Sequence, residues 1–196
     1  GPIDNNAYII SCRSTGEAVI IDAPAESQKL LSELGDVKVK AIFITHRHPD
    51  HTVGLEEVKN HTGAPVASHT DDAPGLPFSP DFQLKDGETY DVGKVRLVVK
   101  HTPGHSPGAM CLLTGKHLFT GDTLFPGGPG HTGSPEAFRQ VKDSIVGKLM
   151  PLDDDTAVYP GHGGDTTIGK ARQEIKAFDS KSHPADLCGS VEWLNS

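Results

Sequence analysis

Residues 45–51 read Thr45-His46-Arg47-His48-Pro49-Asp50-His51 and directly follow the apolar run 41–44. A strand ending at Thr45 would place His46 and His48 on the same side, because side chains alternate along a strand, and Pro49 would bend the chain toward a second position. Imidazole and carboxylate groups are the ligands that zinc, iron and manganese take up. This spacing therefore predicts a loop that can serve two metal ions, rather than a run of solvated histidines.

Three further segments carry ligand-type side chains directly after short apolar runs. They are His101-Thr102-Pro103-Gly104-His105, Gly121-Asp122-Thr123 and Pro160-Gly161-His162. Proteins commonly place functional side chains on loops at strand ends, and glycine and proline shape such loops. We therefore expect these segments to meet residues 45–51 at one edge of a sheet and to complete the metal site.

The order of these motifs along the chain resembles the metallo-beta-lactamase superfamily over residues 4–167. The resemblance implies a mixed α/β (α+β) fold of the αββα sandwich type and two divalent metal ions, with zinc expected and iron or manganese as alternatives. Carried over residue by residue, it implies that His46, His48 and His105 hold the first ion, that Asp50, His51 and His162 hold the second, and that Asp122 bridges the two. Asp50 and Asp122 are also the expected catalytic residues.

Within that superfamily the chain is most similar to the glyoxalase II group, the hydroxyacylglutathione hydrolases. The likeness lies in Asp4-Asn5-Asn6-Ala7-Tyr8, in residues 101–105 and in residues 119–125. True β-lactamases fit less well, because they lack the bridging aspartate. The resemblance implies a hydrolase of a small-molecule thioester, or of a related ester or lactone, in which a metal-bridging hydroxide attacks the carbonyl. A thiolate leaving group suits such a site, because sulfur binds zinc readily.

Two departures from glyoxalase II leave the substrate open. The lysine and tyrosine that help that enzyme to hold glutathione correspond here to His131 and Gly133. We also expect no C-terminal helical domain, because little chain follows His162. The glycine-rich residues 125–133 should be mobile without ligand and should form one wall of the substrate pocket. His131 lies in that loop and is a candidate substrate contact, with a solvated loop residue as the alternative.

Two other functions remain open. Persulfide dioxygenases resemble glyoxalase II but hold one iron, which here would bind His46, His105 and Asp122. They typically carry an Arg-x-Asp signature after the bridging aspartate, which residues 130–133 do not show. A non-catalytic metal-binding scaffold is disfavoured. A protein that had lost its activity would normally have lost at least one ligand residue, and this chain has all seven.

Composition is that of an ordinary enzyme domain. The chain has 196 residues, 35% hydrophobic and 22% charged, so we expect one domain over residues 1–196 with a short tail after residue 179. A net charge of -8 argues against a nucleic-acid partner, since binding to phosphates depends on Lys and Arg. Three separated cysteines and the lack of a membrane-length apolar stretch favour reduced thiols in the cytoplasm and no membrane partner. The oligomeric state, and whether Gly1 and Pro2 are native, stay open.

The pattern of apolar residues predicts alternating strands and helices. Strands are expected at residues 7–12, 18–22, 39–45, 66–68, 89–92, 95–100, 110–113, 117–120 and 156–159, which makes Cys12 and Cys111 small core residues on strands. Helices are expected at residues 24–35, 55–61, 135–149 and 168–178, and a surface loop at 70–80. Hairpins mixed with covering helices fit two packed sheets flanked by helices, which is the architecture that the resemblance implies.

Overall fold

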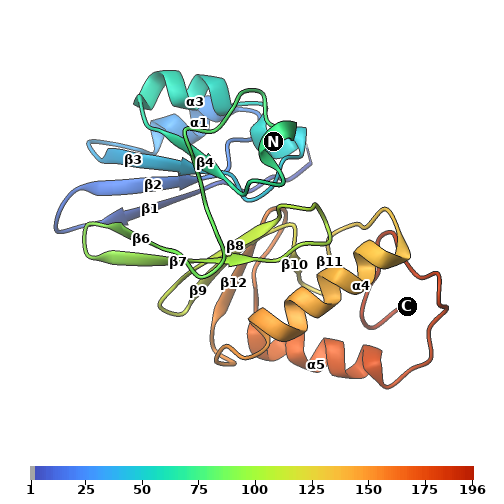
Figure 1. The fold of residues 1–196 in the computed structure, drawn as a ribbon. Helices are drawn as coiled ribbons and strands as arrows, with labels where there is room; N and C mark the ends of the chain where they lie inside the picture. The colour runs from blue at the N-terminus through green and yellow to red at the C-terminus, as the bar shows by residue number, and fades with distance from the viewer. Residues whose placement is uncertain (1–2) are drawn as a thin grey trace.

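Apolar side chains alternate between two faces along the central strands, and this alternation builds two sheets that pack face to face (Figure 1). Ile21 points into the space between the sheets, whereas Ile20 beside it packs against helices. In the second sheet, Leu112 faces the first sheet and Cys111 packs against the helices beyond. The computed structural model describes residues 3–196 and shows the αββα sandwich expected from the sequence.

The two main sheets contain five and six strands. The first runs in the order β1 (Tyr8–Cys12), β2 (Glu17–Ile21), β3 (Lys38–Phe43), β4 (Val66–Ser68) and β5 (Phe82–Gln83), antiparallel between β1 and β2 and parallel beyond. The second runs in the order β13 (Thr166–Thr167), β12 (Ala157–Pro160), β9 (His117–Gly121), β8 (Met110–Thr114), β7 (Val95–His101) and β6 (Thr89–Val92). A short hairpin pairs β10 (Leu124–Phe125) with β11 (Gly128–Pro129). Because β7, β9 and β12 run in one direction, their carboxyl ends lie at the same edge.

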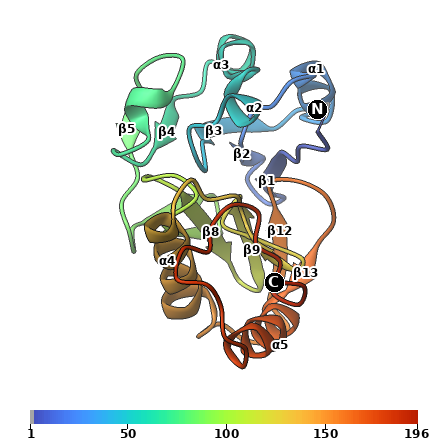
Figure 2. The same cartoon turned by 90° about the vertical axis from the view of Figure 1, so that its right-hand side faces the viewer.

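Helices cover both outer faces of the sandwich. The first sheet is covered by α1 (Ser27–Ser32) and α3 (Leu55–Thr62), with the single turn α2 (Pro49–Thr52) at its edge, and the second by α4 (Pro135–Ser144), the π-helical turn η2 (Ile145–Leu149) and α5 (Ile168–Asp179) (Figure 2). One 3-10 turn, η1 (Ala73–Gly75), lies within the expected surface loop. Leu55 and Val58 of α3 pack against the outer face of the first sheet, whereas Phe138 and Val141 of α4 pack against the outer face of the second.

Most elements lie close to their expected positions, and the main difference is α1. The sequence predicted this helix from residue 24, but it begins at Ser27, because Glu26 has a φ of 63° and a left-handed residue cannot continue an α-helix. The two-residue strands β5, β10, β11 and β13 were not predicted. Strands this short show no periodicity of their own and depend on partners far away in the sequence.

The chain beyond α5 packs back onto the core. Trp193 is fully buried against Phe138 and Phe178, and Val191 belongs to the same apolar cluster. The organisation of residues 1–196 as one domain stays our prediction, and Gly1 and Pro2 lie outside the described residues.

Two of the three cysteines lie where the sequence predicted them. Cys12 and Cys111 are buried on β1 and β8, and Cys188 is exposed. Between residues 3 and 196, no helix has the length and apolar character that crossing a membrane requires.

Candidate metal centre

Four loops bring ligand-type side chains to one edge of the sandwich. The loop and turn after β3 supply His46, His48, Asp50 and His51, and the loops after β7, β9 and β12 supply His105, Asp122 and His162. Pro49 occupies the first position of α2, where a backbone N–H needs no helical partner, so the chain can turn directly after the second histidine. The structure therefore gathers all seven side chains that the sequence predicted as ligands, and their role as ligands stays a prediction.

The first group consists of His46, His48 and His105. Their ligand nitrogens lie within 4.8 Å of one another. The ring centroids are 4.8 Å apart for His46 and His48, 4.5 Å for His48 and His105, and 4.8 Å for His46 and His105. Three imidazoles around one point are a ligand set that divalent zinc accepts.

The second group consists of Asp50, His51 and His162. Oδ2 of Asp50 lies 3.1 Å from Nε2 of His162 and 3.4 Å from Nε2 of His51. The two imidazole nitrogens are 3.1 Å apart. Zinc bound tetrahedrally at about 2.0–2.1 Å from each nitrogen would set its ligands about 3.3 Å apart, so these separations suit one small cation.

Asp122 lies between the two groups. Its Oδ2 is 3.5 Å from Nε2 of His105 in the first group and 3.5 Å from Nε2 of His162 in the second. Its Oδ1 is 3.3 Å from Nε2 of His51. One carboxylate thus faces both groups, which is the arrangement that a shared ligand requires.

Hydrogen bonds on the outer ring nitrogens orient the inner ones. Nδ1 of His51 donates to Asp22 at 3.0 Å, and Nδ1 of His105 donates to the carbonyl oxygen of His131 at 2.8 Å. With Nδ1 occupied in this way, each Nε2 faces the centre. Metal-binding histidines almost always have such a second hydrogen bond, which fixes the tautomer and the ring orientation.

Several buried side-chain atoms that face the centre have no hydrogen-bond partner among the described residues. Nε2 of His46, Nε2 of His105 and Oδ1 of Asp122 are buried and, within residues 3–196, have no conventional hydrogen bond. Burial lowers the pKa of both imidazoles, so they are neutral at neutral pH and offer a lone pair. Buried polar atoms are rarely left unpaired, and this donor set fits a pair of divalent cations.

The second group is strongly charged. Burial opposes a charge on His51, but the neighbouring carboxylates of Asp122 and Asp22 outweigh it and raise the pKa of the ring to about 10. Burial also opposes ionisation of Asp122, yet the nearby imidazoles of His162 and His51 hold the pKa of its carboxyl well below the usual range. A cation that binds here takes the place of the proton on His51.

Asp22 is a buried partner of the candidate centre that the sequence did not predict. It lies just beyond β2, is 2% exposed and accepts hydrogen bonds from the backbone N–H of Thr45 at 2.7 Å and from its hydroxyl at 2.8 Å, as well as from His51. It therefore holds both the start of the metal loop and one proposed ligand. The only signal in the sequence was a carboxylate at the end of an apolar strand.

Asp72 was missed as well. This buried carboxylate accepts hydrogen bonds from the backbone N–H of Arg47 at 2.9 Å, from the hydroxyl of Ser106 at 2.6 Å and from the backbone N–H of Gly108 at 2.8 Å. It joins the loop after β3 to the loop after β7. Each of these loops carries ligands of the first group, so Asp72 fixes their separation.

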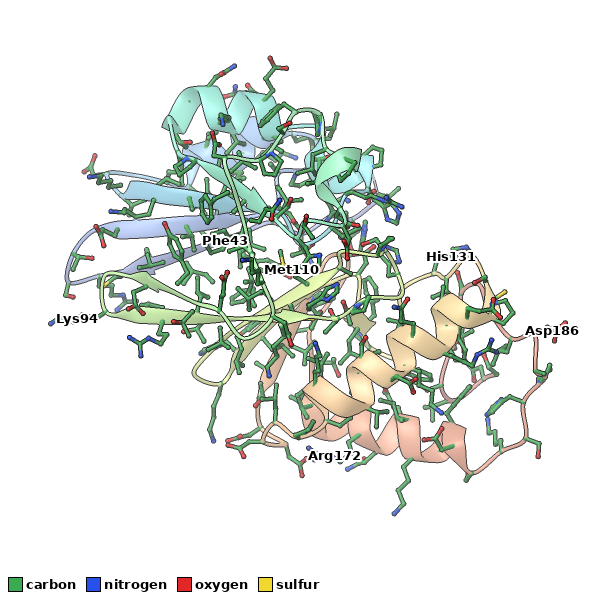
Figure 3. The ribbon with its side chains drawn as sticks, in the orientation of Figure 1. Phe43, Lys94, Met110, His131, Arg172 and Asp186 are labelled. Atoms are coloured by element: carbon green, nitrogen blue, oxygen red, sulfur yellow. The ribbon has the colours of Figure 1, made fainter. Side chains whose placement is uncertain are left out.

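The backbone of residues 125–133 has several hydrogen-bond partners, and the mobility expected of this loop without ligand stays a prediction. Besides the β10–β11 hairpin, the backbone N–H of Gly130 donates to the carbonyl of Asp122 at 3.1 Å, and Thr132 pairs with Gly189 of the C-terminal segment. His131 is exposed beside the start of α4 (Figure 3), and its Nδ1 lies 3.3 Å from the hydroxyl of Ser190. Its backbone supports His105, while the proposed substrate contact of its side chain stays a prediction.

His101, which opens the predicted segment of residues 101–105, is not among the gathered ligands. Its ring stacks on that of His69 with centroids 3.8 Å apart and planes 11° apart, and its Nε2 donates to the carbonyl of Pro107 at 2.9 Å. Asp71 completes a further group of ligand-type atoms. Two parallel stacked rings cannot both direct an in-plane lone pair at one ion, so this arrangement does not suit a metal.

Comparison with known proteins identifies the family of this chain. A protein-family model described as "Metallo-beta-lactamase superfamily" matches residues 1–162. Hydroxyacylglutathione hydrolase GloC of Haemophilus influenzae is 32% identical over 188 residues, which cover 84% of this chain and 90% of that protein.

Solved structures share the fold over most of the chain. BLEG-1, a B3 metallo-beta-lactamase, has a TM-score of 0.79 at 30% identity, covering 88% of this chain and 93% of its own. ETHE1 from Myxococcus xanthus has a TM-score of 0.79 at 29% identity, covering 92% and 82%. TTHA1623 in a di-iron-bound form has a TM-score of 0.73 at 30% identity, covering 88% and 94%. With its motifs, its sandwich and a family match over residues 1–162, this chain belongs to the metallo-beta-lactamase superfamily.

Proposed function

We propose that this protein is a dinuclear metal-dependent hydrolase of a thioester, or of a related ester or lactone. The observation that carries the proposal is the position of Asp122, whose carboxylate faces both groups of ligand-type side chains. Two-metal hydrolases hold two cations about 3.5–4 Å apart, a separation that a shared carboxylate can span. The similarity to hydroxyacylglutathione hydrolase GloC supports a thioester as the substrate class.

Each part of the site has a separate task in this proposal. Two bound cations would activate a water at neutral pH and polarise the substrate carbonyl. Asp122, kept ionised by the nearby imidazoles of His162 and His51, would hold the two positions at a fixed separation. The side chain of Asp50 is 31% exposed, so it lies where the centre opens to solvent and can accept a hydrogen bond from the attacking water.

We further propose zinc as the resident cation and the cytoplasm as the location. Zinc accepts the histidine and aspartate ligands present here, and iron is the first alternative because a relative of this fold holds two iron ions. Three cysteines without a disulfide among the described residues fit a reducing compartment.

The substrate is proposed to bind without a glyoxalase II type of glutathione site. At the two positions concerned, the side chain of His131 lies beside Ser190 and Gly133 has no side chain. We therefore expect S-lactoylglutathione to be hydrolysed poorly. A kcat/KM near the diffusion limit of about 10⁸ M⁻¹s⁻¹ on that thioester would show that other residues hold glutathione.

Metal content and two activity assays test the proposal together. Protein purified without added metal would be subjected to elemental analysis and assayed on a panel of thioesters and lactones, with oxygen consumption followed in parallel. We expect up to two divalent ions per chain and thioester hydrolysis without oxygen uptake. A single iron with oxygen consumption on a persulfide, and no hydrolysis of the panel, would contradict the proposal.

A mononuclear iron persulfide dioxygenase is the second candidate. His46 and His105 both lie beside Asp122, at 3.9 Å and 3.5 Å, so one iron could use these three side chains alone. The similarity to ETHE1 from Myxococcus xanthus keeps this candidate under consideration. The second group argues against this candidate, because a single iron would leave Asp50, His51 and His162 without a metal ion to bind.

A further inference from the structure

The N-terminal segment, residues 3–8, runs alongside the loop that carries His162. Asn5 and His162 form an isolated antiparallel bridge. On either side of it, the backbone N–H of Asn6 donates to the carbonyl of Gly161 at 2.8 Å, and that of Gly163 donates to the carbonyl of Asp4 at 3.1 Å. The first described residues of the chain are therefore a wall of the second group of ligand-type side chains.

This segment also contacts two of the proposed ligands directly. Nδ1 of His162 donates to the carbonyl of Ile3 at 2.9 Å. The amide nitrogen of Asn5 donates to Oδ2 of Asp50 at 3.0 Å and to the backbone carbonyl of Asp50 at 3.2 Å. That Oδ2 is the oxygen that faces His162 and His51, so the amide of Asn5 supports the carboxylate oxygen nearest to the second position.

The amide of Asn5 is oriented by Asp50 alone. Its other end, Oδ1, is buried and lacks a hydrogen-bond partner among residues 3–196. Turning the amide over would place Oδ1 against two oxygens of Asp50, which is repulsive. An asparagine that served packing only would gain nothing from an unpaired buried carbonyl, because such an atom costs stability. The position thus favours a role at the carboxylate.

We infer that Asn5 is a positioning residue of the second metal position: its amide fixes the rotamer of Asp50 so that Oδ2 is held ready for a cation. The inference rests on the proposed dinuclear function. Hydrogen-bond partners of metal ligands typically contribute 10–100-fold to metal affinity. Asn5 should therefore matter for one of the two ions and leave the other unchanged, since none of its hydrogen bonds reaches His46, His48 or His105.

Stepwise metal titration of the metal-free protein tests this inference. Calorimetry with zinc would resolve two binding steps in the wild type. In Asn5→Ala we expect one step to be weakened about 10–100-fold while the other keeps its affinity. The melting temperature of the metal-free protein is measured in parallel, because loss of packing lowers it whether or not metal binds.

Asn6→Ala is the matched control. The side chain of Asn6 donates to the carbonyls of Pro160 at 3.0 Å and Gly163 at 2.9 Å, so its removal also costs two hydrogen bonds of the same segment, but neither reaches a proposed ligand side chain. Unchanged affinity of both steps in Asn5→Ala, or an equal weakening in Asn6→Ala, would overturn the inference and leave the dinuclear proposal standing. A wild-type protein that binds one ion per chain would overturn both.

Discussion

Asp22 shows how much of the candidate centre depends on a residue outside the seven proposed ligands. It is the buried acceptor for both Thr45 and His51. Asp22→Asn keeps the shape and removes the charge, so the ring of His51 should lose its orientation and its strongest outer partner. We expect metal affinity to fall about 10–100-fold, measured by competition with a chelator. Wild-type affinity in this variant would show that Asp22 supports the fold only.

The proton on His51 makes metal binding depend on pH. In the metal-free protein the Asp122 and Asp22 carboxylates raise the pKa of His51 from its ordinary value of 6.5 to about 10, so this group stabilises the fold fully below pH 6.5 and the contribution is lost as pH rises through 10. A metal must displace that proton, so affinity should increase with pH across this window. Calorimetry in buffers of different ionisation enthalpy should detect proton release, and binding without release would contradict the assigned ligand.

Ligands and their supports differ in how far the sequence reveals them. The proposed ligands could be predicted because histidine and aspartate cluster beside glycine and proline within a few positions. Asp22, Asp72 and Asn5 could not be assigned their roles. Each acts through partners more than twenty residues away, and single carboxylates or amides near strand ends are common.

The glycines of the β10–β11 loop predict mobility without ligand, and that stays a prediction. The backbone of this loop contacts Asp122 on one side and the C-terminal segment on the other. The contact between Thr132 and Gly189 spans 57 residues of sequence, so composition could not reveal it. Glycine at 130 serves close packing, because a side chain there would overlap the carbonyl of Asp122 and approach Nδ1 of His105 to 2.8 Å.

Two glycines of that loop give a matched pair of variants. Gly130→Ala should displace His105 or the Asp122 backbone, lowering both metal affinity and stability, the latter by about 1–3 kcal/mol. Gly133→Ala should change neither, since its added methyl group meets no atom of the described chain within 4 Å. Thermal melting and metal content check both. Equal behaviour of the two variants would show that the loop adapts freely.

The backbone and the side chain of His131 have different proposed roles, support of His105 and contact with the substrate. His105 is held by the carbonyl of His131, so His131→Ala should retain metal. If the side chain contacts substrate, KM or substrate preference should change while metal content stays constant. Loss of metal, or identical kinetics across thioesters and lactones, would refute the substrate role.

The sandwich explains why one edge can hold the centre. The first sheet supplies His46, His48, Asp50 and His51, and the second supplies His105, Asp122 and His162. The layers were predictable, because the longer strands show alternating apolar residues and the helices show apolar residues at helical spacing. How the two halves meet was not, since it is set by particular contacts such as that from the backbone N–H of Met110 to the carbonyl of Thr45 at 2.9 Å.

The same sandwich occurs in proteins with different names. GloC is a hydroxyacylglutathione hydrolase and BLEG-1 a B3 metallo-beta-lactamase, and each is similar to most of this chain. Fold alone therefore does not select the substrate, and the choice depends on the loops around the centre.

Asp122→Ala, compared with wild type for metal content and thioester hydrolysis on the same preparations, tests the shared carboxylate. Because Asp122 faces both groups, its removal should lower the metal-to-protein ratio and nearly abolish hydrolysis together. We expect up to two ions per chain in the wild type and clearly fewer in the variant. A fully metallated and active Asp122→Ala protein would contradict a dinuclear centre built on this residue.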